Sequence, residues 1–235
     1  MLAIYKRELR SYFITPIGYI FCAMFLLVSG LLFYQTTLAN QSTESLGMYF
    51  LFLICVFAIL IPLLTMKLFA DDRRTKTEQL LLTAPVSLTG MVMGKYLAAL
   101  TIYGCTFVIN SLNFVLLYRY GAPNTAAIFA NIFGVFLIGA AFIAVGLFVS
   151  SLTQSQLIAA VSSIGAIVSM LLLYLVGDAI PYAWLRSALQ WISVLDRYVP
   201  FMNQTLSIPA ILYYISLAAV FVFLTVRVYD KRRWS

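Results

Sequence analysis

Few side chains in this 235-residue sequence are of types that do chemistry, and their spacing matches no common catalytic or metal site. Histidine is absent, and the three cysteines, Cys22, Cys55 and Cys105, have no paired spacing. The adjacent carboxylates Asp71 and Asp72 lack the further carboxylates and the glycine spacing of a Mg²⁺–diphosphate site. Since histidine is the usual acid–base residue near neutral pH, we predict no catalytic residue, no metal site and no cofactor in the chain itself.

Neutral polar side chains are the remaining candidates for a site inside the chain. Thr106, Asn110 and Asn113 are spaced i, i+4 and i+7, which places them on one face of a helix. Inside a membrane, such side chains either hydrogen-bond to neighbouring helices or line a path for a substrate. Both uses stay open at this point.

The elements that must position these side chains are membrane-spanning helices. The chain is 63% hydrophobic and 10% charged, and ~20 apolar residues in a helix cross ~30 Å of hydrocarbon. We therefore predict an all-α polytopic membrane protein with a single domain over residues 1–235. Its predicted spans are residues 17–38, 46–66, 95–118, 126–149, 157–177 and 209–229.

The distribution of basic residues predicts the orientation of these spans. If the N-terminus is cytoplasmic, twelve of the fifteen Lys and Arg residues lie on the cytoplasmic side, and only Arg119, Arg186 and Arg197 lie outside. Cytoplasmic loops carry the excess of basic residues, so both termini are predicted to be cytoplasmic. These residues flank helix ends at membrane height, and we therefore expect them to face the lipid bilayer surface and not nucleic acid.

The acidic residues argue against a carrier driven by protons or sodium. Such carriers bury an ionisable residue near the middle of the bilayer, because that group must bind the coupling ion. Every acidic residue here falls at a span end or in a connection: Glu8, Glu44, Asp71, Asp72, Glu78, Asp178, Asp196 and Asp230.

The connection between the second and third spans, residues 67–94, has features that a solvated loop does not need. A charged run at 71–76 cannot enter the bilayer, and the leucines at 80–82 then form one apolar side of a short helix. Pro85 ends that helix, because proline disfavours helical geometry at the residue before it. We predict a structured cytoplasmic segment, which we call the elbow.

The third span follows the elbow. Ser87 or Thr89 can cap the helix that leads into it, since hydroxyl side chains accept hydrogen bonds from the first free N–H groups of a helix. Lys95 stands at the predicted start of the span, where its amine is expected to reach toward the polar interface.

Two parts of the chain, each with two short segments, resemble those of a known family. Residues 77–87, TEQLLLTAPVS, and residues 94–98, GKYLA, are similar to the pattern T-x-E-x-L-L-x-x-P-[VI]-S…G-K-x-x-A of type-2 ABC export permeases. Residues 5–13, YKRELRSYF, and residues 15–19, TPIGY, resemble the N-terminal segment of the same family. Within the family, the chain looks most similar to short six-span subunits of the gliding-motility and peptide-export type.

The resemblance implies that the elbow carries a coupling helix, which docks on an ATPase subunit. The connection between the fourth and fifth spans, residues 150–156, would make a second and smaller contact. The implied docking residues are Arg73, Arg74, Thr75, Lys76, Glu78, Gln79, Leu80, Leu82, Pro85 and Ser87.

The resemblance also implies helices that lie at the two membrane surfaces. An amphipathic interface helix would precede the first span and would carry Tyr5, Lys6, Arg7, Glu8 and Arg10. Re-entrant or interfacial helices between the fifth and sixth spans would lie on the outer side. Their aromatic residues Tyr182, Trp184 and Trp191 either anchor the segment in the interface or form an outer gate.

The function implied is that of a permease subunit in an ATP-driven exporter of a bacterial cytoplasmic membrane. The chain has no G-x-x-x-x-G-K-[ST] phosphate loop, so ATP and Mg²⁺ would bind to a partner pair of ABC ATPase subunits. A second copy or a homologous membrane subunit would complete the substrate path, and an auxiliary extracytoplasmic protein is a further conceivable partner. The alternatives are a non-transporting membrane scaffold of an ABC-type complex, an ion-coupled carrier and a membrane enzyme.

Overall fold

The computed structural model describes residues 1–38, 46–79, 87–120, 124–179, 182–203 and 205–233, which form helices and no strands. Six helical runs are long and apolar enough to cross a membrane: Pro16–Thr37, Leu46–Arg74, Leu88–Leu117, Thr125–Leu152, Gln156–Gly177 and Ile208–Arg233. The prediction of an all-helical chain with six candidate membrane spans is therefore confirmed. The helices are α1 (Leu2–Ile14), α2 (Pro16–Phe33), a π-helical turn η1 (Tyr34–Leu38), α3 (Leu46–Thr65), α4 (Lys67–Arg74), α6 (Leu88–Ser111), α7 (Asn113–Tyr120), α8 (Thr125–Leu152), α9 (Gln156–Ala179), α10 (Ala183–Ile192), α11 (Val199–Met202) and α12 (Ile208–Arg233).

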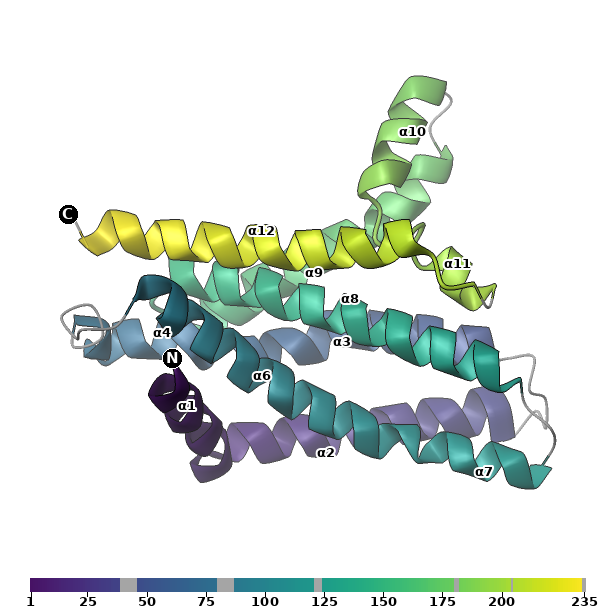
Figure 1. Cartoon of the computed structure of the whole chain (residues 1–235), viewed down its shortest axis with the longest axis horizontal. Helices are drawn as coiled ribbons and strands as arrows, with labels where there is room; N and C mark the ends of the chain where they lie inside the picture. Colours follow the sequence, from purple (N-terminus) through teal and green to yellow (C-terminus); the bar gives the residue numbers. More distant parts are fainter. Residues whose placement is uncertain (39–45, 80–86, 121–123, 180–181, 204, 234–235) are drawn as a thin grey trace.

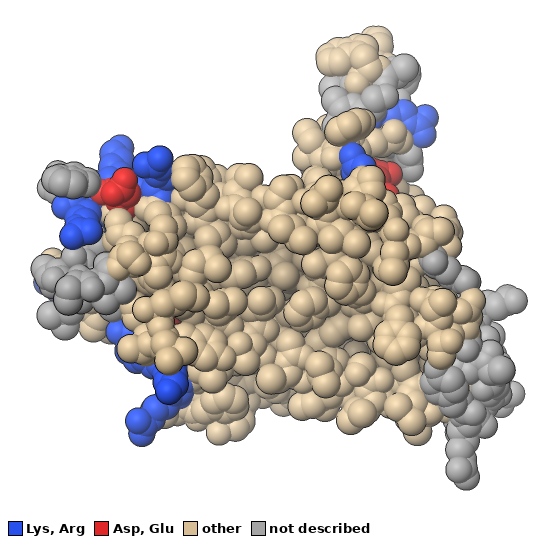
Figure 2. All heavy atoms as spheres, in the orientation of Figure 1, with Lys and Arg blue, Asp and Glu red and all other residues tan. Residues whose placement is uncertain are grey.

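The long helices lie side by side, and both chain termini are at the same end of the bundle (Figure 1). The short helix α1 crosses that end and packs against α2 and α6. At the opposite end, α10 projects away from the bundle. Lys and Arg side chains gather mainly at the end that holds the termini (Figure 2), which we call the basic end.

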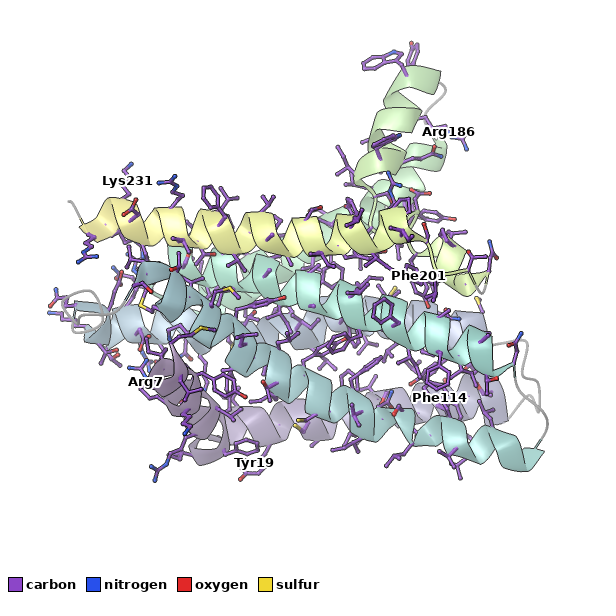
Figure 3. All side chains as sticks on the ribbon, in the orientation of Figure 1. Arg7, Tyr19, Phe114, Arg186, Phe201 and Lys231 are labelled. Atoms are coloured by element: carbon purple, nitrogen blue, oxygen red, sulfur yellow. The ribbon has the colours of Figure 1, made fainter. Side chains whose placement is uncertain are left out.

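Helix α8 lies at the centre of the packing, in contact with α3, α6, α9 and α12. At three of its glycines, a side chain from another helix packs where a Cβ atom would lie. A Cβ atom at Gly134 would lie 2.8 Å from the ring of Phe201, which points at α8 from α11 (Figure 3). At Gly139 it would lie 2.2 Å from the Tyr103 hydroxyl, and at Gly146 it would lie 2.2 Å from the Thr65 hydroxyl of α3. Close helix approach through small residues is the usual packing mode in membranes.

Replacing Gly139 by alanine is expected to destabilise the bundle. Tyr103 is fully buried and its hydroxyl donates to the carbonyl of Val135 at 3.1 Å, so the added methyl group must displace both the ring and this hydrogen bond. We expect a loss of about 1–3 kcal/mol, as for other overpacked cores. Thermal unfolding of the purified protein in detergent measures the effect. Gly165→Ala is the control, because nothing lies within 4 Å of its Cβ position, and equal melting temperatures for the two variants would contradict the prediction.

Capping residues place two helix starts earlier than predicted. Ser87 is the N-cap of α6 and its hydroxyl accepts from the Gly90 N–H at 3.2 Å, so one of the two predicted caps is confirmed. The helix that contains the start of the third predicted span, residues 95–118, consequently begins at Leu88. Asn124 caps α8 through its side-chain oxygen. For α6, hydrophobicity alone marked the apolar part of the helix and missed its first turns, whereas for α8 the difference is one residue.

Candidate functional site

The elbow lies at the basic end and begins as a continuation of the second span. Helix α4 follows α3 directly, and a turn at 75–76 leads to a short helical segment at 77–79. Lys76 has a left-handed backbone with φ of 58°, and its N–H donates to the Arg73 carbonyl at 3.2 Å. Left-handed geometry costs a non-glycine residue roughly 1–2 kcal/mol, so the surrounding contacts must hold this turn.

The structure describes part of the predicted docking surface. Leu80, Leu82 and Pro85, and with them most of the predicted coupling helix, lie outside the described residues. The remaining docking residues are placed at the end of α4, in the turn, in the 77–79 segment and at the start of α6: Arg73, Arg74, Thr75, Lys76, Glu78, Gln79 and Ser87.

A buried group of charges connects the elbow to α1 and α6. The amine of Lys95 lies 2.6 Å from the Asp72 carboxylate and 3.0 Å from that of Glu8, and it also donates to the Leu68 carbonyl. Arg7 completes this Lys95 cluster through Glu8 and, at 3.6 Å, through Asp72. The Lys95 side chain is only 1% exposed, so the expectation that its amine reaches the polar interface is wrong. Two carboxylates from other helices neutralise it inside the protein.

The position of Glu8 follows from the way α1 packs. Predicted as part of an interface helix, it is buried with Ile4 and Tyr12 on the inner side of α1, whereas Lys6 and Arg10 are exposed. The Tyr12 hydroxyl donates to the carbonyl of residue 64 at 2.7 Å, and burial, with a contribution from the Glu8 charge, raises the pKa of this phenol well above its usual value.

Arg7 and Tyr5 also take part in the contacts of α1. Burial lowers the pKa of Arg7, but its hydrogen bond to Glu8 and the charges of Glu8 and Asp72 raise it by more, so the guanidinium stays charged. The Tyr5 hydroxyl hydrogen-bonds to that of Thr101 on α6 at 3.0 Å. Sequence reasoning placed these residues on an interface helix, and it missed the contact of Tyr5 with α6 and that of Arg7 with Asp72 of α4.

A second group of charges, the Glu78 cluster, connects the elbow to the ends of α8 and α12. One carboxylate oxygen of Glu78 lies 3.4 Å from Arg73 Nε, and the other lies 3.3 Å from an Nη of Arg232. The two arginines also donate to the last carbonyls of α8, Arg73 to Leu152 at 2.9 Å and Arg232 to Ser151 at 2.7 Å. Sequence analysis selected Arg73 and Glu78 but counted Arg232 only as one of the cytoplasmic basic residues.

The connection between α8 and α9 lies beside the elbow. The Ser150 hydroxyl accepts from the N–H groups of Phe69 and Ala70 and donates to the Met66 carbonyl, which holds the junction of α3 and α4. Gln156 donates to Asp71 at 2.8 Å. A groove of about 690 Å³ separates the two segments; its lining is Arg73, Arg74, Lys76, Glu78 and Gln79 from the elbow and residues 154–157 from the connection. The two segments with predicted ATPase contacts thus line one groove.

The polar face of α6 makes hydrogen bonds within the chain. Thr106 is buried, donates to the Ile102 carbonyl and hydrogen-bonds to the Cys22 thiol of α2. Asn110 donates to the Tyr49 hydroxyl of α3 at 2.9 Å and accepts from Asn113 at 3.0 Å. These contacts are of the interhelical kind that the sequence left open as one of two uses.

The predicted outer residues lie on or next to α10, at the end opposite the elbow. Tyr182, Trp184 and Trp191 have exposed side chains, at 66%, 74% and 72%. Trp191 has the Arg197 guanidinium 5.1 Å from its ring. Since α10 projects from the bundle (Figure 1), these rings are free to contact lipid or another chain.

The described ranges hold no group of three or more His, Cys, Asp and Glu side chains that could bind a metal ion. No curated protein matches the chain. The sequence profile of the ABC-2 type transporter family, a family of membrane permease domains without ATPase activity of their own, matches residues 1–208. The match covers both N-terminal signature segments, the elbow and five of the six candidate spans. This chain belongs to the ABC-2 type transporter family of membrane proteins.

Proposed function

We propose that this chain is the permease subunit of an ATP-driven exporter and that its elbow docks on a separate pair of ABC ATPase subunits. The groove between the elbow and the 154–157 connection carries this proposal. Two chain segments meet there at the basic end, and they present exposed charges to a partner. Arg74 is 65% exposed on its side chain, and Lys76 is exposed in the turn.

The two charge clusters suggest how a movement of the elbow reaches the spans. The Lys95 cluster connects α4 with α1 and α6, and the Glu78 cluster connects the elbow with α8 and α12. ATP and Mg²⁺ would bind to the partner ATPases. If ATP favours one relative position of the two elbows in a pair of permeases, the clusters would carry that preference to the helices, because coupling requires a difference in affinity between two arrangements.

The pair would enclose the substrate path. We propose that a second copy or a homologous subunit supplies the other half, and that the membrane is a bacterial cytoplasmic membrane with both termini in the cytoplasm. The orientation rests on the concentration of Lys and Arg at the basic end (Figure 2). In this arrangement α10 would lie on the outer side, with Trp184 and Trp191 as parts of an outer gate. If the path opens laterally to the bilayer, the exported substrate would be amphipathic or lipid-like.

Purification of the tagged chain from its native membrane tests the docking proposal. We expect an ATPase with a phosphate loop to be recovered with the wild-type protein and to be lost with Arg74→Glu/Lys76→Glu. These side chains point into the groove and are exposed, so reversing their charge opposes docking without disturbing the core. Mass spectrometry of the recovered proteins gives the result.

Lys6→Glu/Arg10→Glu is the matched control, since both residues are exposed at the same end but lie outside the groove. Recovery of the ATPase with the groove variant would refute docking at this site. An ATPase that is recovered, and whose turnover responds to no exported solute, would instead favour the scaffold function.

A further inference from the structure

A large apolar groove runs along the side of the bundle between α6 and α12, with α8 at its floor. Its volume is about 970 Å³, and the side chains that line its length include Tyr96, Leu100, Leu137, Ala218 and Val222. All three helices are candidate membrane spans, so the groove lies at the depth of the bilayer. An apolar groove of this size at that depth is expected to hold an apolar group.

One end of the groove is charged. Arg227, Asp230 and Arg233 line it at the basic end, opposite Thr89 in the first turn of α6. The Arg227 side chain is 64% exposed and lies over the Phe223 ring. Its ion pair with Asp230 is long, at 3.5 Å. Two arginines against one carboxylate leave a positive charge, and the positive end of the α6 helix dipole adds to it. The apolar groove therefore ends at a site suited to an anion.

We infer that this groove binds one anionic glycerophospholipid of the leaflet at the basic end. An acyl chain occupies the apolar length, and the phosphate group lies between Arg227, Arg233 and the first turn of α6. The geometry matches a phospholipid because its apolar chain is joined to an anionic head group. In the protein, the apolar groove likewise ends at the positive charge. This lipid is a resident ligand of a single chain, and its binding requires neither ATP nor an ATPase.

Charge also argues against a second copy of the chain as the occupant. Two copies in one membrane share the same orientation, so a symmetric contact through this groove would bring Arg227 and Arg233 of one copy near the same residues of the other. Like charges facing each other oppose such a contact. A phospholipid meets the same surface with opposite charge.

Native mass spectrometry of the full-length protein in detergent tests the inference. After delipidation, the protein is titrated with phosphatidylglycerol and, separately, with phosphatidylcholine. We expect preferential retention of one phosphatidylglycerol molecule. Affinity for it should fall about fivefold for each arginine removed, and thus roughly twenty- to thirtyfold in Arg227→Gln/Arg233→Gln. Ala218→Trp should block retention of both lipids, because the indole fills the groove.

Two control variants match these changes. Lys231→Gln removes a positive charge from the same end of α12, but Lys231 points away from the bundle (Figure 3) and does not line the groove. Val220→Trp adds the same indole on another side of α12. Both should bind phosphatidylglycerol as the wild type does. Equal affinity for the two lipids, or wild-type binding by the arginine and Ala218 variants, would overturn the inference. So would a change of oligomeric state in Ala218→Trp with lipid binding intact, since the groove would then hold another protein chain.

Discussion

Replacing Lys95 by methionine is expected to be among the most damaging single substitutions in this protein. The side chains of Glu8 and Asp72 are only 9% and 16% exposed, and in the variant they would face a methyl group where the Lys95 amine was. Removal of one partner from a buried ion pair costs about 3–5 kcal/mol because the remaining charge loses its compensation. Arg7 still offsets part of the charge of Glu8 and Asp72, so we expect a loss near the lower end of that range. We expect a variant that unfolds at a clearly lower temperature or fails to accumulate in the membrane.

The cause of that loss can be tested by removing the remaining charges. In Lys95→Met/Glu8→Gln/Asp72→Asn no buried carboxylate is left unpaired. Arg7 loses both partners, but its side chain is 47% exposed and water can solvate its charge. Stability should therefore return to within about 1–2 kcal/mol of the wild type, since replacing a buried ion group is often nearly neutral. Lys6→Met is the control for losing an exposed lysine at the same end. Thermal unfolding in detergent compares all four proteins. If the single variant is as stable as the control, the Lys95 cluster contributes nothing to stability.

Recovered stability would not imply recovered function. The Lys95 cluster consists of charged contacts among α1, α4 and α6, whose geometry is directional. The triple variant replaces them by weaker neutral contacts. Under the proposed mechanism, it should fold normally and yet transmit elbow movement less well, which separates the two contributions of the same residues.

Composition and periodicity were sufficient to predict six long apolar helices, because a helix in lipid needs a long apolar run whatever its neighbours are. They could not predict the partners of Lys95. Glu8 lies 87 positions away in the sequence, and its contact depends on the side of α1 that packs against α6. The amphipathic pattern of residues 2–14 is compatible with either membrane or protein on that side.

The same limit applies to the proposed docking surface. Sequence patterns located the elbow and selected Glu78 and Arg73, but Arg232 is 154 positions from Glu78 and carries no signal other than its charge. The face with Thr106 and Asn110 was visible from spacing alone. Its hydrogen bonds to Cys22 and Tyr49 depend on how α2 and α3 pack against α6, and local sequence does not contain that information.

Exchange of the charges of Glu78 and Arg232 tests how the elbow is held. Under the proposed function, Glu78→Arg should reduce the ATP turnover of the purified permease–ATPase complex about tenfold, equivalent to about 1.4 kcal/mol, because it loses the ion pairs to Arg73 and Arg232 and places three arginines together. Glu78 is 14% exposed and pairs with two arginines of its own chain. We therefore propose that it positions the groove, while Arg74 and Lys76 meet the ATPase directly.

The double variant Glu78→Arg/Arg232→Glu distinguishes positioning from direct contact. If Glu78 acts through Arg232, the exchanged pair restores the connection between the elbow and α12, and most of the lost turnover returns. If Glu78 contacts the ATPase, its charge stays reversed at that surface and turnover remains low. Lys231→Glu, combined with Glu78→Arg, is the control, because Lys231 makes the same charge change one position away without reaching Glu78. If turnover returns when Glu78→Arg is combined with Arg232→Glu but not with Lys231→Glu, the Glu78 cluster belongs to the path by which ATPase movement reaches α12.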